Sequence, residues 1–403
     1  MAASEAQRLA HDFDLNRLPA SFYADPYPTY AALRAHDPVH RCADGSYFLT
    51  RYADLDAVYR DRTHFSSDKR EAFRPKFGGD TPLYEHHTTS LVFNDAPYHT
   101  RVRRQIVAAL SPQVLRAMEP AITTLVDGLL ARIEELQQFD LIEHFAAAIP
   151  VEVIGNLLRV PRADRGALRG WSLAILGALE PVLSSEQLEC GHRAVTDFSA
   201  YLRELLAARR RDPGDDNDLL TRLLRAGDLS ERELLQNCVF LLNAGHETTT
   251  NLIGNGAWLF LNAPQAAERL RADPTLAAGA VEECLRMESP NQLGNRLVIE
   301  RVRVGGVELE PGTYLTLGIG AANRDPAEFP EPDRFDITRK PNHHLAFAAG
   351  AHACAGMNVA RLEAQIALLR LLQRLPGLRL AGEPLRGARA RFRGFSSLPA
   401  AVR

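Results

Sequence analysis

Cys354 is the residue of this sequence whose surroundings best suit chemistry. It stands in the glycine- and alanine-rich stretch Phe347–Gly356, directly before a helical pattern that starts at Asn358. Small residues let the backbone pass close to a flat ligand. A thiolate near a helix N-terminus is stabilised by N–H groups and by the helix dipole, which lower its pKa and make it a competent metal ligand. A single thiolate suits haem iron, because the porphyrin supplies four ligands and the sixth position stays open. The alternative is a small buried cysteine in a flexible loop.

An acid and an alcohol stand side by side at Glu247 and Thr248, in the middle of a long helical pattern. Thr248 follows Ala244 by four residues, so its hydroxyl can bond the Ala244 carbonyl. The neighbouring carboxyl of Glu247 could exchange protons with that hydroxyl. The alternative, a solvated polar patch, fits poorly on a helix with so many apolar neighbours.

Two further pairs carry charge at spacings that share one helix face. His99 and Arg103 are four residues apart, and Glu283 and Arg286 are three apart. Cationic side chains suit the carboxylates of a ligand. Each pair alone is equally well explained by a solvated surface helix, so these pairs gain meaning only together with other motifs.

The elements that must position these residues are mainly helical. Ser230 and Glu233 form a capping box that predicts the start of the longest helix, and Pro264 marks its far end. Alternating residues around Gly305 and Gly306 predict a hairpin over 297–318, and 47–50 predicts a second β region. Helical spacing of apolar residues recurs at 123–139, 196–211, 231–261 and 358–375. The sequence therefore predicts a polar segment over 1–20 and one mainly α domain with small β-sheets over 21–403.

Composition excludes several classes of protein. The chain has 403 residues and a formal charge of −3, which does not favour nucleic-acid binding. Its five cysteines are far apart and odd in number, so disulfides and structural zinc are not expected. The first twenty residues hold neither a signal peptide nor a membrane anchor, so we expect a cytoplasmic protein.

The segment Phe347–Gly356 closely resembles the haem-binding loop of the cytochromes P-450, Phe-Gly-x-Gly-x-His-x-Cys-x-Gly. Ala348 departs from that pattern, since the family usually has glycine there. The order of the other motifs along the chain is also similar: Ala244–Thr248 resembles Ala-Gly-x-Asp/Glu-Thr, and Glu283–Arg286 resembles Glu-x-x-Arg. The resemblance implies the cytochrome P-450 fold, with haem b between the long central helix and the cysteine-loop helix.

The resemblance also implies roles for individual residues. Cys354 would ligate the iron, within a loop shaped by Phe347, Gly350 and Gly356. Ala244 and Gly245 would leave room for dioxygen, while Glu247 and Thr248 would supply protons. The haem propionates would be bound by His99, Arg103, Arg296 and His352.

Three further assignments follow from the same resemblance. Arg334 would join Glu283 and Arg286 in a buried structural ion network. Arg101 and Arg104 would belong to the surface that receives the electron donor. Apolar residues would line the substrate pocket, and the candidates are Leu91, Val92, Leu241, Leu293 and Phe395.

The implied activity is that of a soluble bacterial class I monooxygenase, which inserts one atom of dioxygen into a small to medium hydrophobic substrate, with hydroxylation as the default reaction. Since the sequence has no flavin or iron–sulfur motif, electrons from NAD(P)H must arrive through a separate ferredoxin, or a flavodoxin, and its reductase. We expect a monomer. The alternatives are a haem-thiolate peroxygenase that uses hydrogen peroxide and a catalytically silent haem-binding sensor.

A basic and aromatic segment, Asp68–Phe77, lies in the region that resembles a substrate-recognition segment. Its composition suggests an acidic substrate, such as a fatty or aromatic carboxylic acid. The alternative is an ordinary solvated loop.

Overall fold

The computed structural model describes residues 4–213 and 219–402. Helices dominate and the sheets are small, which confirms the predicted fold class. The α-helices are α1 Glu5–His11, α2 Ala20–Ala24, α3 Tyr27–His36, α4 Tyr52–Arg60, α5 Arg70–Phe77, α6 Pro82–Thr89, α7 Tyr98–Ala109, α8 Pro112–Glu134, α9 Ala148–Leu157, α10 Gly166–Gly177, α11 Ser185–Arg211, α12 Leu219–Ala226, α13 Glu231–Asn262, α14 Pro264–Ala272, α15 Ala277–Met287, α16 Ile319–Ala322 and α17 Met357–Arg374.

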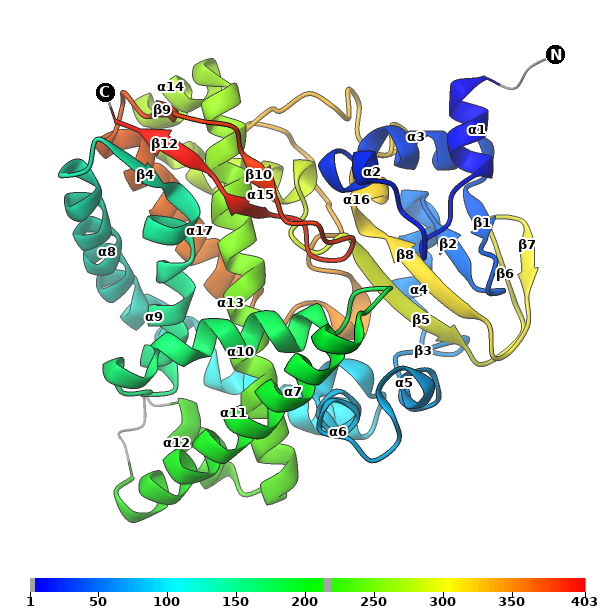
Figure 1. Cartoon of the computed structure of the whole chain (residues 1–403), viewed down its shortest axis with the longest axis horizontal. Helices are drawn as coiled ribbons and strands as arrows, with labels where there is room; N and C mark the ends of the chain where they lie inside the picture. Colours follow the sequence, from blue (N-terminus) through cyan, green and yellow to red (C-terminus); the bar gives the residue numbers. More distant parts are fainter. Residues whose placement is uncertain (1–3, 214–218, 403) are drawn as a thin grey trace.

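The long helix α13 runs through the middle of the helical half of the molecule, with the larger sheet to one side (Figure 1). It starts where the capping box predicted: the Glu233 N–H donates to the Ser230 hydroxyl, and the Ser230 N–H donates to the Glu233 carboxylate at 2.8 Å. Its end is fixed by Pro264, which begins α14. Because α13 packs against α9, α15 and α17, its residues are buried on almost every side.

The larger sheet has the strand order β1 (Val39–Arg41), β2 (Tyr47–Leu49), β8 (Tyr314–Gly318), β5 (Leu293–Val298) and β3 (Phe65–Ser66). The predicted β region at 47–50 is therefore present. The predicted hairpin over 297–318 is divided between two sheets: β6 (Val302–Val304) and β7 (Val307–Leu309) form a short ribbon around the two glycines, while β5 and β8 pair in the larger sheet.

The C-terminal strands return to the helical half. Strand β12 (Pro399–Ala401) pairs with β4 (Gln138–Asp140) and with β9 (Arg379–Leu380), and β10 (Leu385–Arg386) pairs with β11 (Phe395–Ser397). These pairings hold the intervening loop, residues 387–394, beside α13 (Figure 1).

The N-terminal segment contains α1 and contributes Ala10 and Phe13 to a buried cluster with Phe22, Tyr30 and Phe48. The division of the chain into residues 1–20 and 21–403 stays a prediction, and residues 1–3 and 403 lie outside the described part. Over the residues that the structure describes, no helix is both long and apolar enough to cross a membrane.

Candidate active site

A buried cavity of about 340 Å³ separates α13 from the loop that carries Cys354. Its size lies within the range of ligand cavities, roughly 300–1,000 Å³. Most of the residues that the sequence singled out line this cavity, although they come from five separate parts of the chain. They are Leu91, Val92, His99, Arg103, Leu241, Ala244, Gly245, Thr248, Leu293, Arg296, Phe347, His352, Cys354 and Gly356.

Cys354 lies just before α17, and its side chain is exposed to the cavity. The Cys354 N–H donates to the Phe347 carbonyl at 2.9 Å, which closes the loop. Burial raises the pKa of the Cys354 thiol, while the Gly356 N–H and the Arg103 and Arg361 guanidinium groups act to lower it. The Gly356 N–H at the start of α17 thus acts in the expected direction, but burial is the larger effect, so the net shift of this pKa is upward.

Two residues of the cysteine loop have left-handed backbone conformations. Gly350 has a φ of +66°, and a Cβ there would lie 2.4 Å from the Tyr59 carbonyl oxygen, so Gly350 serves packing against α4 and does not line the cavity. Ala348 has a φ of +55°. Left-handed geometry costs an L-residue roughly 1–2 kcal/mol, which gives a physical reason for glycine at that position in similar loops.

On the α13 side, the Thr248 hydroxyl donates to the Ala244 carbonyl at 2.7 Å, as the four-residue spacing predicted. Ala244, Gly245 and Thr248 all face the cavity. A Cβ on Gly245 would lie 2.3 Å from the Cδ1 atom of Ile154. The absence of a side chain at Gly245 therefore serves the close packing of α13 on α9 as well as the space above the cysteine.

Glu247 is buried but does not line the cavity. Its Oε1 atom accepts a hydrogen bond from the Arg389 guanidinium, and its Oε2 atom has no partner among the described residues. Arg389 also donates to the Leu173 carbonyl at 3.0 Å. The sequence placed Glu247 simply next to the alcohol and missed Arg389, which lies 142 residues away in the C-terminal loop.

Nitrogen-bearing side chains gather at one edge of the cavity. The rings of His99 and His352 lie 3.9 Å apart between centroids, and the Nε2 atom of His99 has no partner in the described structure. Burial, reinforced by the nearby His352 and Arg103, lowers the pKa of His99 to about 4. Arg296 is buried and stacks over the Tyr59 ring at 5.0 Å. Together with Arg103, these residues form a site suited to carboxylates.

The structural ion network differs from the sequence prediction in one member. Arg286 donates to both oxygens of Glu283 at 2.8 Å, and both side chains are 0% exposed. Arg334 was expected as the third member, but its side chain is 62% exposed and pairs with Glu331; only its backbone carbonyl accepts from Arg286. Arg339 takes the place instead, with its Nε atom 3.3 Å from Glu283.

The predicted pocket residues need one correction. Phe395 does not line the cavity: it belongs to β11, where its ring lies 5.7 Å from that of Trp258 and 3.7 Å from the Arg386 guanidinium. Phe392, three residues earlier, faces the cavity in its place. The prediction reached the correct loop but not the correct side chain.

The two arginines expected on the partner surface have different environments. Arg101 is held by the Glu233 carboxylate at 2.5 Å and by the Asp228 carbonyl, so it ties α7 to the start of α13. The Arg104 side chain is 71% exposed and lies 3.6 Å from Asp228. Only Arg104 is free to meet another protein without breaking a buried contact.

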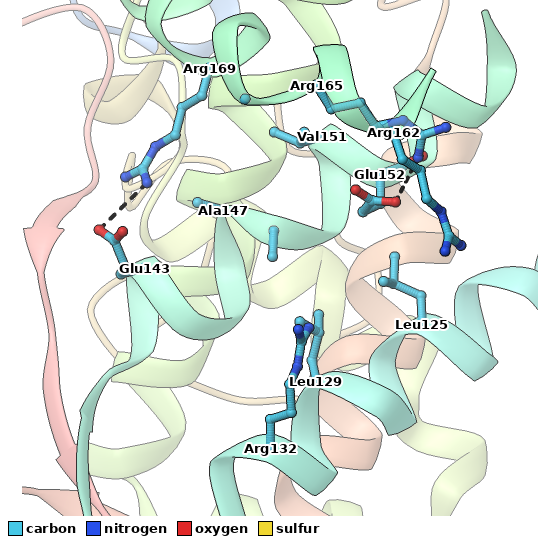
Figure 2. Close-up of a pocket in the computed structure, with 12 residues that line it drawn as sticks. Leu125, Leu129, Arg132, Glu143, Ala147, Val151, Glu152, Arg162, Arg165 and Arg169 are labelled. Atoms are coloured by element: carbon cyan, nitrogen blue, oxygen red, sulfur yellow. Dashed lines mark hydrogen bonds and ion pairs between the residues drawn. The ribbon is translucent and has the colours of Figure 1, made fainter. Parts of the chain in front are cut away.

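A second cavity lies between α8, α9 and α10 and contains none of the predicted site residues. Figure 2 shows two of its four arginines in ion pairs: Arg165 with Glu152 at 2.6 Å and Arg169 with Glu143 at 3.6 Å. Although it is larger, at about 500 Å³, it is open and has no reactive side chain facing a buried space. We therefore assign the chemistry to the cavity at Cys354.

A cysteine facing a buried cavity, beneath a long helix with a cavity-facing alcohol and beside a carboxylate-binding edge, defines a haem-thiolate protein. Comparison with known proteins agrees. The Cytochrome P450 family model matches residues 173–376. The cytochrome P450 monooxygenase PikC of Streptomyces venezuelae is 37% identical over 401 residues, covering 96% of this chain and 93% of its own.

Two solved structures are similar over nearly the whole chain. P450BioI in complex with an acyl carrier protein ligated to hexadec-9Z-enoic acid has a TM-score of 0.90 at 34% identity, covering 95% of this chain and 100% of that one. The myxobacterial CYP267B1 in complex with myristic acid has a TM-score of 0.87 at 36% identity, covering 95% and 98%. The chain belongs to the cytochrome P450 family, which binds haem through a cysteine thiolate, and it is an enzyme of the P450 monooxygenase type.

Proposed function

We propose that this enzyme inserts one atom of dioxygen into an apolar organic acid or a related hydrophobic substrate, with hydroxylation as the main reaction. The observation that carries the proposal is the placement of Cys354 and Thr248 on the walls of one cavity. One residue would hold the iron, and the other would handle protons where oxygen reacts.

The residues present fit a haem. Cys354 offers its sulfur to the cavity, and Gly356 beside it has no atom within 4 Å of the position of a Cβ, so a flat ligand can approach the loop. The unpartnered Nε2 atom of His99, with Arg103 and Arg296, would receive the haem carboxylates. When bound, the haem supplies the reductive activation of dioxygen.

Proton handling would fall to Thr248 and Glu247. Thr248 keeps its hydroxyl at the cavity wall through its bond to the Ala244 carbonyl. Because Arg389 occupies the Oε1 atom of Glu247, the unpartnered Oε2 atom is the one able to hold a proton. The carboxyl does not face the cavity, so a proton must pass from it to Thr248 through a water or a rotation of the side chain.

The shape of the cavity and the relatives support an apolar substrate. Leu91, Val92, Leu241 and Phe392 form apolar walls. The two solved relatives hold a fatty acyl group and a fatty acid, respectively. We infer a fatty or aromatic acid as the substrate class of this enzyme.

Electrons would come from NAD(P)H through a ferredoxin and its reductase, or through a flavodoxin. The exposed Arg104 supports a docking face of positive charge for such acidic carriers. Reconstitution with each carrier, compared between the parent enzyme and Arg104→Ala, would identify the donor. Equal rates at low ionic strength would exclude this face.

The proposal is tested by the absorption spectrum of the dithionite-reduced protein with carbon monoxide, beside the Cys354→Ser variant. We expect the strongly red-shifted Soret band of a thiolate–haem complex in the parent protein and its complete loss in the variant. An unchanged band in the variant would show that Cys354 is not the ligand.

Turnover then separates monooxygenase from peroxygenase and sensor. We expect label from oxygen-18 gas in the product when NAD(P)H and the electron carriers are present. Product formed only with hydrogen peroxide would favour a peroxygenase, and substrate binding without product under either condition would favour a sensor.

A further inference from the structure

The basic segment Asp68–Phe77 places only one of its cationic side chains toward the cavity. Arg70 pairs with Asp68 and donates to Asn94 at 2.7 Å. Lys76 donates to the Glu180 carbonyl at 2.6 Å. Neither residue lines the cavity, whereas Lys69 does.

Lys69 is buried without any hydrogen-bond acceptor. Its side chain is 2% exposed, and its Nζ atom has no partner among the described residues. The face of the Tyr314 ring lies 4.9 Å from Nζ, measured to the ring centroid, which is a weak substitute for a hydrogen-bond acceptor. Burial and the cations Arg296 and Arg391 lower the pKa of Lys69 well below its ordinary value, although the more distant carboxylates of Asp95 and Asp68 oppose this shift. A buried amine without a hydrogen-bond partner is costly in either protonation state, so its presence in a cavity points to a ligand.

A second polar atom nearby is also unsatisfied. Ser67 is 2% exposed, its hydroxyl has no partner in the described structure, and it lines the same cavity. Its backbone N–H is bound to Asp95 at 3.0 Å, which fixes its position. One buried cation and one buried hydroxyl thus face the cavity with unused hydrogen-bonding capacity.

The charges around the cavity leave a cationic excess. Its guanidinium and ammonium groups belong to Lys69, Arg103, Arg296 and Arg391. Burial raises the pKa of Glu363, the one carboxyl among the described residues that line the cavity, well above its ordinary value, so this group stays neutral. The two carboxylates of a haem would balance Arg103 and Arg296. An acid bound beside Lys69 would then meet the positive charge of Arg391 and would favour the charged form of Lys69.

Arg391 is fixed in place by other parts of the chain. It donates to the Leu293 carbonyl at 2.6 Å, to the Asn295 side chain at 2.6 Å and to the Leu179 carbonyl at 2.9 Å. These bonds hold the positive charge of Arg391 beside the cavity. Because its N–H groups are used in them, Arg391 is not needed to bind a haem propionate. Its field adds to that of Lys69 on the wall that also carries Phe392.

We propose that Lys69, with the Ser67 hydroxyl, binds the carboxylate of an apolar acid substrate and so fixes which carbon of the chain lies below Thr248. This inference rests on the proposed function, because it names the substrate class of the same site. Arg391 strengthens the field at that point. An acid bound in this way would give the buried amine of Lys69 a hydrogen-bond partner.

The test uses the haem-loaded ferric enzyme and spectral titration with octanoic, dodecanoic and hexadecanoic acids and with their methyl esters. The parent enzyme should bind at least one acid about 10- to 100-fold more tightly than its ester, as expected for one charge-assisted contact. Lys69→Met should lose this preference, and Lys69→Arg should recover part of it. Lys76→Met is the matched control, because it removes a lysine from the same segment, and it should keep the preference.

Haem content and the reduced carbon monoxide spectrum, measured for each variant, separate the possible failures. Equal affinity for acids and esters in the parent enzyme, or no binding of any acid, would overturn the Lys69 subsite while leaving the monooxygenase intact. If Lys69→Met loses haem, while the protein that still holds haem keeps its preference for the acid, Lys69 serves the haem carboxylates. A parent enzyme without a thiolate–haem spectrum would overturn the proposed function itself.

Discussion

The molecule contains two buried charged regions that differ in whether their polar groups have partners. Around Glu283, both carboxylate oxygens accept hydrogen bonds, from Arg286, the Asp336 N–H, Arg339 and Asn342. Around the cavity, the described side chains of Ser67, Lys69, His99 and Glu363 each leave a buried polar atom without a partner.

This difference separates a structural site from a functional one. Buried polar groups in proteins are almost always hydrogen-bonded, and exceptions require an explanation. Both carboxylate oxygens of Glu283 have partners without any ligand, although the Oδ1 atom of the neighbouring Asn342 has none among the described residues, so this network contributes to the fold. The polar groups at the cavity find hydrogen-bond partners only in molecules that bind there. They lower the stability of the protein and are kept for function.

The largest effect is expected from breaking the complete network. Arg286→Leu leaves the Glu283 carboxylate buried and unpaired, which should lower the free energy of unfolding by about 3–5 kcal/mol. Urea unfolding of the haem-loaded protein measures this loss. A loss below about 1 kcal/mol, the range of exposed ion pairs, would contradict the view that this network holds the fold.

Thr248→Ala should affect turnover and leave stability almost unchanged. Loss of a proton-handling group should reduce product formed per NAD(P)H by about 100-fold or more. The matched control is Thr250→Ala, because the Thr250 hydroxyl makes the same kind of bond, to the His246 carbonyl at 3.0 Å, but does not line the cavity. Equal losses in both variants would mean that the helix, rather than the cavity-facing hydroxyl, is responsible.

Arg339→Ala and Arg334→Ala test the corrected membership of the network. The Arg339 side chain is 10% exposed and meets Glu283, so its removal should cost about 1–3 kcal/mol of unfolding free energy. Arg334, at 62% exposed, should cost less than about 0.5 kcal/mol. If urea unfolding shows a larger loss for Arg334→Ala than for Arg339→Ala, the third member of the network is Arg334, as expected from the sequence.

Lys69→Met should raise the free energy of unfolding, in contrast to the arginine variants. Without substrate, the Lys69 amine of the parent enzyme is buried without a hydrogen-bond partner, and an apolar side chain of similar length removes that cost. We expect the substrate-free, haem-loaded variant to be about 1–2 kcal/mol more stable to urea. A clear loss of stability would show that Lys69 has a structural partner.

Ala348→Gly should have the smallest effect. Relief of the left-handed strain at Ala348, where φ is +55°, is partly offset by the greater flexibility of glycine in the unfolded chain, so the change should be within about 1 kcal/mol. The thiolate–haem spectrum should stay in place. Complete loss of haem in this variant would contradict our account of the loop.

Features set by neighbouring residues could be predicted from the sequence. The capping box located the start of α13, the glycine pair located the β6–β7 turn, and the spacing of Ala244 and Thr248 predicted their hydrogen bond. Each depends on contacts within one element, where periodicity fixes geometry. The loop at Cys354 was assigned by its resemblance to the haem-binding loop of the family, since the residues alone also fitted a small buried cysteine.

Contacts between distant segments could not be predicted. Arg334 and Arg339 lie in one irregular stretch, and only the folded path of that stretch decides which guanidinium turns inward. The Glu247–Arg389 pair joins residues 142 positions apart. Composition likewise marked 68–77 as basic but did not reveal that Lys69 is the one cation of this segment that faces the cavity, because Lys69 is the N-cap of α5 and lies outside the helical spacing of Phe73 and Phe77.

The C-terminal loop has a consequence for biosynthesis. Residues 387–394 lie between β10 and β11 and supply Arg391 and Phe392 to the cavity wall. During translation this wall leaves the ribosome after both the long helix and the cysteine loop, which precede it along the chain. The cavity can therefore close only after residues 387–394 have emerged.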